Sequence, residues 1–139
     1  MEWTEDLAVG VARLDNQHKE LFHKINHLVA AIKEARCKYI IDGTIKFLED
    51  YATLHFAEEE RCMEESGYEE YVKHKEHHAS FLVALLELRK EAALPRKADS
   101  SYDLCVAANQ VVVDWITAHI MQYDRRFGAF LKTARQKAC

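Results

Sequence analysis

Apolar residues recur every three or four positions along most of this chain, as they do on the buried face of an α-helix. The pattern predicts four helices of similar length, joined by short connections. Asp15 or Asn16 can cap the first helix, which ends within Arg36 to Lys38. The second spans about 41–65, and Gly67 is a stop signal after it.

The third predicted helix begins at Glu69 or Glu70 and ends before Pro95. Its inner stripe comprises Tyr71, His74, His78, Phe81, Leu82, Leu85 and Leu88. A polar connection over about 96–101 leads into the fourth helix, which begins at Ser100 or Ser101 and carries an apolar stripe as far as Phe130.

Residues 1–13 have no helical period, and their apolar side chains alternate instead. We expect an extended arm that turns Trp3, Leu7, Val9 and Val11 toward the helices; an edge strand is the other interpretation, but it has no second strand to pair with. The predicted fold is therefore all-α: an antiparallel up-down four-helix bundle with an N-terminal arm, in one domain over 1–139, with the bundle at about 14–134.

Composition narrows the class of protein. Four glycines and one proline in 139 residues suit long helices, and a net charge of −4 with mixed signs gives no basic surface for nucleic acid. No signal peptide is visible, and no apolar run approaches the length of a membrane span, so we expect no membrane insertion. The four scattered cysteines, Cys37, Cys62, Cys105 and Cys139, are expected to be reduced thiols of a cytoplasmic protein.

Histidine is the unusual component, with eight residues in the chain. Each predicted helix places potential metal ligands on its inner stripe, namely His18, then His55 with Glu59, then His74 with His78, then His119 with Asp124. Taken singly, each histidine could be a hydrogen-bonded core residue. Together, without a metal, they would leave a cluster of buried polar groups unsatisfied, so a metal site on facing helices is the better interpretation.

Other polar residues nearby are expected on the surface: His23, His27, His77, Glu58 and Glu60. They fall out of phase with the inner stripes. Asp124 is also out of phase, because a step of five residues from His119 rotates about 140° on a regular α-helix. A local bulge, or a long reach toward a centre between helices, would be needed to bring it in.

These residues resemble the hemerythrin family, and within it the bacterial type, over essentially the whole chain. The matching segments are Trp3 with Leu7 to Val11, Leu14 to Phe22, Tyr51 to Glu59, Met63, Gly67-Tyr68, His74 to His78 with Phe81, and Trp115-Ile116 through His119-Ile120 to Asp124. The family uses the five-residue step from His119 to Asp124. Glu69 departs from it, since many members have proline there.

The resemblance implies a non-haem di-iron centre. His74, His78 and His119 would bind one iron and His18 and His55 the other, while Glu59 and Asp124 bridge them with an oxo or hydroxo group. Dioxygen would then bind reversibly as hydroperoxide at the two-histidine iron. Trp115 and Ile116, one turn before His119, would line an apolar oxygen pocket, although plain core packing explains each of them singly.

The expected function is reversible oxygen binding for storage, delivery or sensing, without enzymatic activity. The alternatives are a redox, oxygen or nitric oxide sensor and a di-iron peroxidase-like enzyme. An oxygen-consuming enzyme or a signalling protein would be the partner. Glu-x-x-His pairs would favour the enzyme class, and the inner stripes do not carry them.

Overall fold

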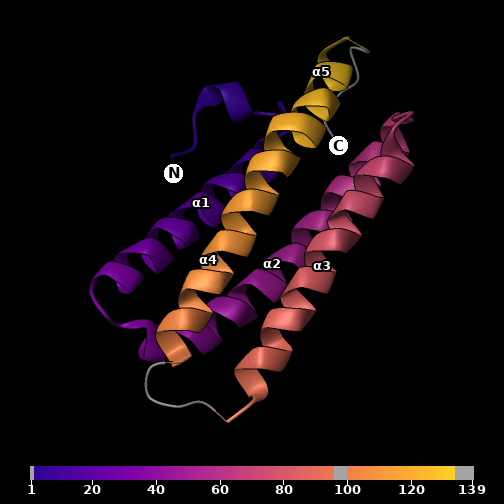
Figure 1. The fold of residues 1–139 in the computed structure, drawn as a ribbon. Helices are drawn as coiled ribbons and strands as arrows, with labels where there is room; N and C mark the ends of the chain where they lie inside the picture. The colour runs from indigo at the N-terminus through magenta and orange to yellow at the C-terminus, as the bar shows by residue number, and fades with distance from the viewer. Residues whose placement is uncertain (1, 96–99, 134–139) are drawn as a thin grey trace.

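Four long helices run antiparallel in the computed structural model, which describes residues 2–95 and 100–133 (Figure 1). The helices are α1 (Ala12–Lys33), α2 (Cys37–Ser66), α3 (Tyr71–Ala93) and α4 (Ser100–Ala118). The last continues without a break through a π-helical segment, η2 (His119–Asp124), into α5 (Arg125–Thr133). No strand occurs among the described residues, and the prediction of an all-α bundle is confirmed.

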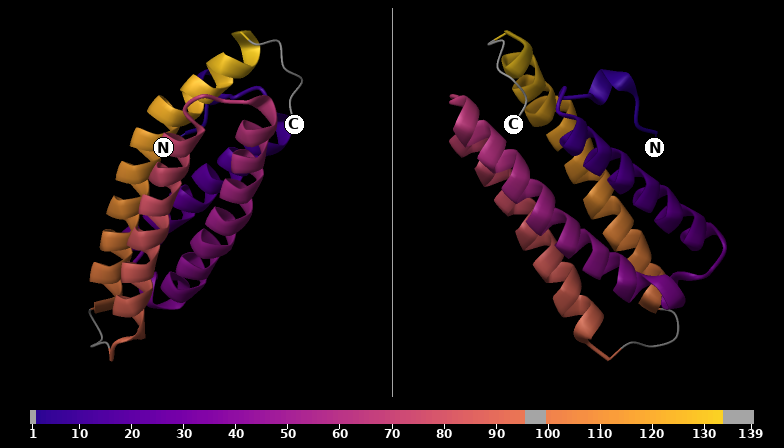
Figure 2. Two further views of the ribbon diagram at one scale, coloured as in Figure 1. Left: turned by 90° about the vertical axis from the view of Figure 1, so that its right-hand side faces the viewer. Right: turned by 180° about the vertical axis from the view of Figure 1, so that it is seen from behind.

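The inner faces are those that the apolar periods predicted. α1 and α4 lie side by side, as do α2 and α3, and α2 also packs against α1 and α4 (Figure 2). Ile41, Leu48, Phe81 and Ile116 are buried in the larger core cluster, which fills the bundle on one side of the polar residues. A smaller cluster around Phe127 closes the other end. The buried histidines and carboxylates thus lie between these two apolar clusters.

The N-terminal arm packs inward as expected, with Leu7, Val9 and Val11 buried and Trp3 partly buried. It is not wholly extended, because a 3-10 turn, η1 (Glu5–Leu7), interrupts it. The arm crosses α5 at Gly128, where an added Cβ would lie 2.9 Å from the Cα of Val9. Only glycine allows the two backbones to approach so closely.

The predicted start of the first helix is wrong. α1 begins at Ala12, and Asp15 lies inside its first turn instead of capping it from outside. The Asp15 carboxylate accepts hydrogen bonds from the backbone N–H groups of Val9 (2.8 Å) and Gly10 (3.3 Å). Asp15 therefore ties the arm to the helix, a contact between sequence neighbours that a capping rule does not anticipate.

The other predicted boundaries vary in accuracy. α1 ends at Lys33, a turn early, and α2 begins at Cys37, four residues early, after a reversal at Ala35 with φ 55°. Gly67 ends α2 in the left-handed conformation, as predicted. Residues 96–99 of the predicted connection lie outside the described residues. Leu82 is 44% exposed, so its place on the inner stripe is wrong: neighbouring Phe81 takes the inward position.

Two expectations from composition also need correction. Cys37 and Cys105 are buried reduced thiols, whereas Cys62 is disulfide-bonded, and Cys139 lies outside the described residues. Spacing along a chain does not tell which thiols a fold brings together, so the expectation of reduced thiols fails at Cys62. Cytoplasmic location, which rested partly on it, stays a prediction.

The last helix is more apolar than expected. By length and composition, its stretch Ser101–Thr133 is long and apolar enough to cross a membrane. The mean hydropathy is 1.3 over its most apolar 18 residues. The expectation that no apolar run approaches a span is wrong here. Core helices of soluble bundles share this composition, and the helix turns His119 and Asp124 toward the other three helices, where both are buried.

Candidate metal centre

Seven buried side chains meet between the two apolar clusters, and they are the seven predicted from the sequence. They form two overlapping groups in which one ligand atom from each residue lies within 4.8 Å of all the others. The first group comprises Glu59, His74, His78, His119 and Asp124; the second comprises His18, His55, Glu59 and Asp124. Glu59 and Asp124 belong to both, which is the arrangement of two metal ions that share two carboxylates.

Regular helical geometry places four of these residues. His55 and Glu59 on α2, and His74 and His78 on α3, are four residues apart and thus on one face, one turn apart. All four face the bundle axis because apolar residues at helical spacing flank them on the same stripes. His18 reaches the same level from α1.

Asp124 reaches the site through the π-helical segment. His119–Asp124 forms i→i+5 turns instead of the i→i+4 turns of an α-helix, so a residue five positions along returns toward the same face. The His119 Nε2 and Asp124 Oδ1 atoms lie 2.8 Å apart as a result. The bulge that the sequence required for Asp124 is therefore present, and it spans the interval between these two residues.

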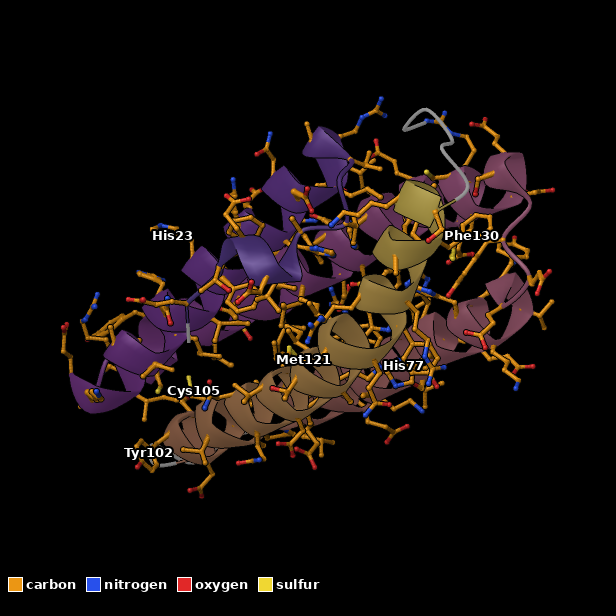
Figure 3. The ribbon with its side chains drawn as sticks, turned by 90° about the horizontal axis from the view of Figure 1, so that it is seen from above. His23, His77, Tyr102, Cys105, Met121 and Phe130 are labelled. Carbon is orange, nitrogen blue, oxygen red and sulfur yellow. The ribbon has the colours of Figure 1, made fainter. Side chains whose placement is uncertain are left out.

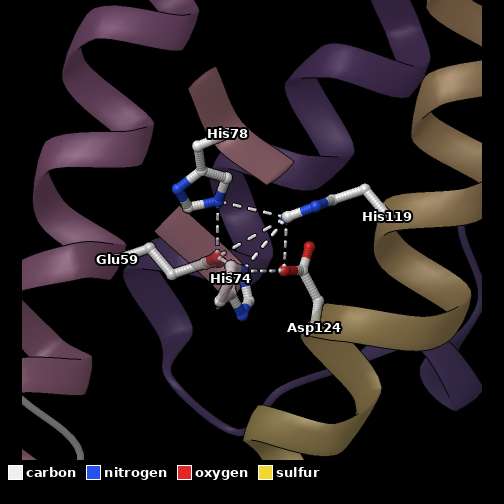
Figure 4. Close-up of side chains that lie close together, drawn as sticks. All are labelled: Glu59, His74, His78, His119 and Asp124. Atoms are coloured by element: carbon white, nitrogen blue, oxygen red, sulfur yellow. Dashed lines mark hydrogen bonds and ion pairs between the residues drawn. The ribbon is translucent and has the colours of Figure 1, made fainter. Parts of the chain in front are cut away.

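The three-histidine group is closely packed around one oxygen of each carboxylate (Figure 4). Glu59 Oε1 lies 2.6 Å from His74 Nε2 and 3.1 Å from His78 Nε2. Asp124 Oδ1 lies 3.0 Å from His74 Nε2. The Nε2 atoms of His74 and His78 are each 3.1 Å from that of His119. Three imidazole nitrogens and two carboxylate oxygens thus converge on one point.

The two-histidine group uses the remaining oxygens. His18 Nε2 and His55 Nε2 lie 3.0 Å apart. Asp124 Oδ2 lies 3.2 Å from His18 Nε2, and Glu59 Oε2 lies 3.4 Å from His55 Nε2. Each carboxylate therefore presents one oxygen to each group.

A second ring of side chains holds the outer nitrogens of three histidines. His55 Nδ1 donates to Gln17 Oε1 at 2.6 Å, and Gln17 Nε2 in turn donates to Glu58 at 2.6 Å. His78 Nδ1 donates to the Glu60 carboxylate at 2.9 Å. Such partners fix the orientation and tautomer of an imidazole that ligates a metal.

His77 belongs to this second ring as well. Its Nδ1 lies 2.7 Å from His119 Nδ1, and the two rings stack at 5.0 Å with an angle of 5° between them. Burial, followed by the charges of the neighbouring histidines, lowers the pKa of His77 to about 4, so the ring is neutral at pH 7.

The expectation that His77, Glu58 and Glu60 are plain surface residues is therefore wrong. His27 and His23 are exposed as predicted, and His23 is labelled in Figure 3. Each of the three half-buried residues is adjacent in sequence to a residue of the centre. A side chain one position from an inward residue points along the seam between two helices, where the outer nitrogen of a neighbouring ring lies. Adjacency to His78 and Glu59 was the available signal.

The two carboxylates are ionised. Burial alone would raise the pKa of Glu59, but the hydrogen bonds of four surrounding imidazoles, including His119 and His74, hold it well below its ordinary value. Burial and the charge of Glu59 act upward on Asp124, and His119 and His18 outweigh them, so its pKa is also lowered. The site thus offers two anionic and five imidazole ligands.

The donor atoms fit metal ions better than protons. Burial lowers the pKa of His55, and with its Nδ1 donating to Gln17 the neutral ring leaves Nε2 as an acceptor, which faces His18 Nε2 at 3.0 Å and the Glu59 Oε2 acceptor at 3.4 Å. Despite their close imidazole nitrogens, Glu59 Oε2 and both oxygens of Asp124 are buried without a hydrogen bond of good geometry among the described residues. Cations between these atoms would satisfy all of them, and imidazole with carboxylate suits iron and other borderline metals.

A small cavity adjoins the two-histidine group. The cavity has a volume of about 10 Å³, which leaves room for about one water-sized molecule. The lining includes His18, His55 and the predicted pocket residues Trp115 and Ile116. Trp115 has a second role, because its ring stacks on His119 at 4.2 Å.

The sequence matches the family model described as the hemerythrin HHE cation binding domain over residues 9–131. The chain belongs to the hemerythrin family. It is 29% identical to a bacteriohemerythrin of Stenotrophomonas maltophilia over 133 residues, which covers 94% of this chain and 80% of that protein. It is 30% identical to myohemerythrin-1 of Phascolopsis gouldii over 125 residues, with 90% and 89% covered.

A bacteriohemerythrin of Pseudomonas aeruginosa is 39% identical over a shorter stretch of 87 residues, 63% of this chain and 56% of that protein. Membership places this chain among di-iron, oxygen-binding proteins of bacterial hemerythrin type. The buried histidine and carboxylate cluster is a suitable site for the two irons.

Proposed function

We propose that His74, His78 and His119 hold one iron, that His18 and His55 hold the other, and that Glu59 and Asp124 bridge them. The observation that carries this assignment is the sharing of both carboxylates between the two groups of ligand atoms. In this assignment, the protein would supply five donor atoms to one iron and four to the other. The iron with fewer protein donors is the one with room for a further ligand, and the cavity lies beside its two histidines.

A pair of ferrous ions held by these residues would supply the electrons with which dioxygen is held and then released. The chain's own residues make the surroundings suitable for that use. Leu21, Phe56 and Ile120 line the cavity with apolar surface, which keeps bulk water from a bound ligand. Two anionic and five neutral ligands leave the centre less negative than a carboxylate-rich one, which favours holding dioxygen over oxidising substrates.

The proposed role is therefore reversible oxygen storage or delivery, without enzymatic turnover. An oxygen-consuming enzyme would be the recipient. A sensing role is the second candidate, favoured by the contact of the N-terminal arm with the segment that carries His119 and Asp124. A movement of Asp124 would reach Val9 through Gly128, four residues farther along.

The deciding experiment is an optical spectrum of the iron-loaded, anaerobically reduced protein before and after oxygen is admitted, and again after degassing. Iron is counted per chain in the same sample. Two irons and a visible charge-transfer band that disappears on degassing are the expected result. Immediate and irreversible conversion to the diferric state would contradict storage and favour redox sensing, and zinc or no metal would overturn the assignment.

A further inference from the structure

Tyr51 separates two hollows in the bundle. On its outer side is a surface pocket of about 210 Å³ between α1 and α2, lined by Gln17, Glu20, Phe47, Asp50 and Leu54 together with Tyr51 and His55. On its inner side is the cavity beside the two-histidine group. Tyr51 and His55 are the two residues that line both hollows, so they form the wall between the pocket and the candidate metal centre.

Of these two residues, Tyr51 is the one free to act on a ligand. His55 is held at both ring nitrogens, by Gln17 on one side and by the groups of the candidate centre on the other. The Tyr51 ring is stacked between Phe47 (6.1 Å) and His55 (5.0 Å), but its hydroxyl is buried and has no hydrogen-bond partner among the described residues.

An unpaired buried hydroxyl needs an explanation, because it destabilises a folded protein. Phenylalanine would fill the same space and keep the same stacking without that cost. The ordinary pKa of a tyrosine is about 10, so at pH 7 the group is a phenol. It can therefore donate a hydrogen bond to a molecule that enters the cavity.

We infer that Tyr51 is a ligand-positioning residue: its hydroxyl donates a hydrogen bond to a small ligand held in the cavity, and its ring closes the cavity toward the surface pocket. The inference rests on the proposed function, since it assumes iron beside His18 and His55. The ligand class is a small molecule or anion with an acceptor atom, such as dioxygen or azide.

Azide binding to the oxidised, iron-loaded protein tests the hydroxyl. Tyr51→Phe removes only the oxygen atom, and a net hydrogen bond corresponds to about 2- to 10-fold in affinity. We expect azide to bind more weakly by that factor, with a faster dissociation rate. The matched control is Tyr123→Phe, the same change next to the three-histidine group, where Tyr123 stacks on His119, and there azide affinity should stay the same.

The metal-free protein gives an independent measurement. Because the hydroxyl has no partner among the described residues, Tyr51→Phe should leave the urea midpoint of the metal-free chain unchanged or raise it. A lower midpoint would show that the hydroxyl has a structural partner and would overturn the inference. So would unchanged azide affinity in a Tyr51→Phe protein that contains two irons.

Two variants test whether the Tyr51 ring closes the cavity toward the surface pocket. Tyr51→Leu should speed azide association at least 3-fold by opening the wall, with circular dichroism and iron content confirming the fold. Leu54→Trp changes a residue that is 58% exposed at the outer pocket, and should slow association without affecting folding. Association rates that neither variant changes would overturn the closing role.

These results separate the inference from the proposed function. A parent chain without two irons would overturn both. A parent chain that holds two irons and binds oxygen reversibly, but whose azide affinity and rates do not depend on Tyr51, would overturn the inference alone.

Discussion

The two halves of the candidate centre are built differently. Around the three histidines, aromatic rings are stacked closely: the His119 ring has Trp115 at 4.2 Å, His77 at 5.0 Å and Tyr123 at 5.5 Å, all within 13° of parallel. The two-histidine half instead faces the small cavity, and Tyr51 stacks on His55 at its edge. One half is filled and the other has room.

This difference in packing indicates that the two halves have separate functions. A packed half with five protein donors suits an iron that stays fixed, and a half with four donors and a cavity suits one that exchanges a ligand. The outer hydrogen bonds do not differ in this way: in the packed half His78 and His119 have half-buried partners in Glu60 and His77, and His74 Nδ1 has none among the described residues. On the other side a single glutamine, Gln17, holds His55, and His18 Nδ1 has no partner among the described residues.

The largest effect is expected from removing a histidine of the packed half. His119→Ala should reduce iron from two per chain to less than one, because Asp124 and Glu59 lose a partner that both carboxylates share. Breaking a buried charged set costs about 3–5 kcal/mol, so the thermal midpoint should fall markedly. His23→Ala, on the exposed face of α1, is the control, and a His119→Ala chain with two irons and full stability would refute the assignment.

Gln17→Ala weakens the open half selectively. Without the acceptor for His55 Nδ1, iron affinity should fall about 10- to 100-fold, which is the usual effect of losing such a partner. We expect chelator titration to remove one iron early and the other at nearly the parent concentration. Gln110→Ala, an exposed glutamine paired with Asp114, is the control. Equal weakening of both irons would contradict the distinction between the halves.

Gly128→Ala tests whether the scaffold can be changed without changing the open half. The added Cβ meets the backbone of Val9, which has little room to move, and overpacking of this kind costs about 1–3 kcal/mol in unfolding free energy. Gly43→Ala is the matched control, because open space surrounds that position inside α2, and it should stabilise by about 0.5–1 kcal/mol. Denaturant unfolding measures both. A storage protein should keep its oxygen affinity in Gly128→Ala, whereas altered affinity would favour sensing through the arm.

The smallest effect is expected from Trp115→Phe in the packed half. The change keeps an aromatic ring against His119 but removes the indole N–H, which donates to the His77 carbonyl (3.2 Å) and Ser80 Oγ (3.0 Å). Loss of these bonds should cost about 0.5–1.5 kcal/mol. Two irons should remain. Because Trp115 also lines the cavity, a small change in azide affinity is expected, below that of Tyr51→Phe, and a larger change would show that Trp115 belongs to the open half.

The fold followed from local rules. A 3.6-residue period identifies an inward face without knowledge of the neighbouring helix, and it placed Ile41, His55, Glu59 and His74 correctly in the core. Boundaries were less accurate, since Asp15 is an acceptor for the arm as well as a residue of the first turn. Leu82 was misplaced because two adjacent apolar residues cannot both face inward, and periodicity alone did not choose between Leu82 and Phe81.

The sequence by itself placed His18, His55, Glu59, His74, His78 and His119 on inward faces, because residues at helical spacing on an amphipathic helix share a face wherever that helix packs. It could not place Asp124, whose position depends on hydrogen bonds of the π-helical segment. Nor could it identify the second ring of Gln17, Glu60 and His77, the disulfide at Cys62, or the wall formed by Tyr51. These features depend on the distance between residues on different helices or distant in the chain, which is a property of packing, and only the tertiary structure decides it.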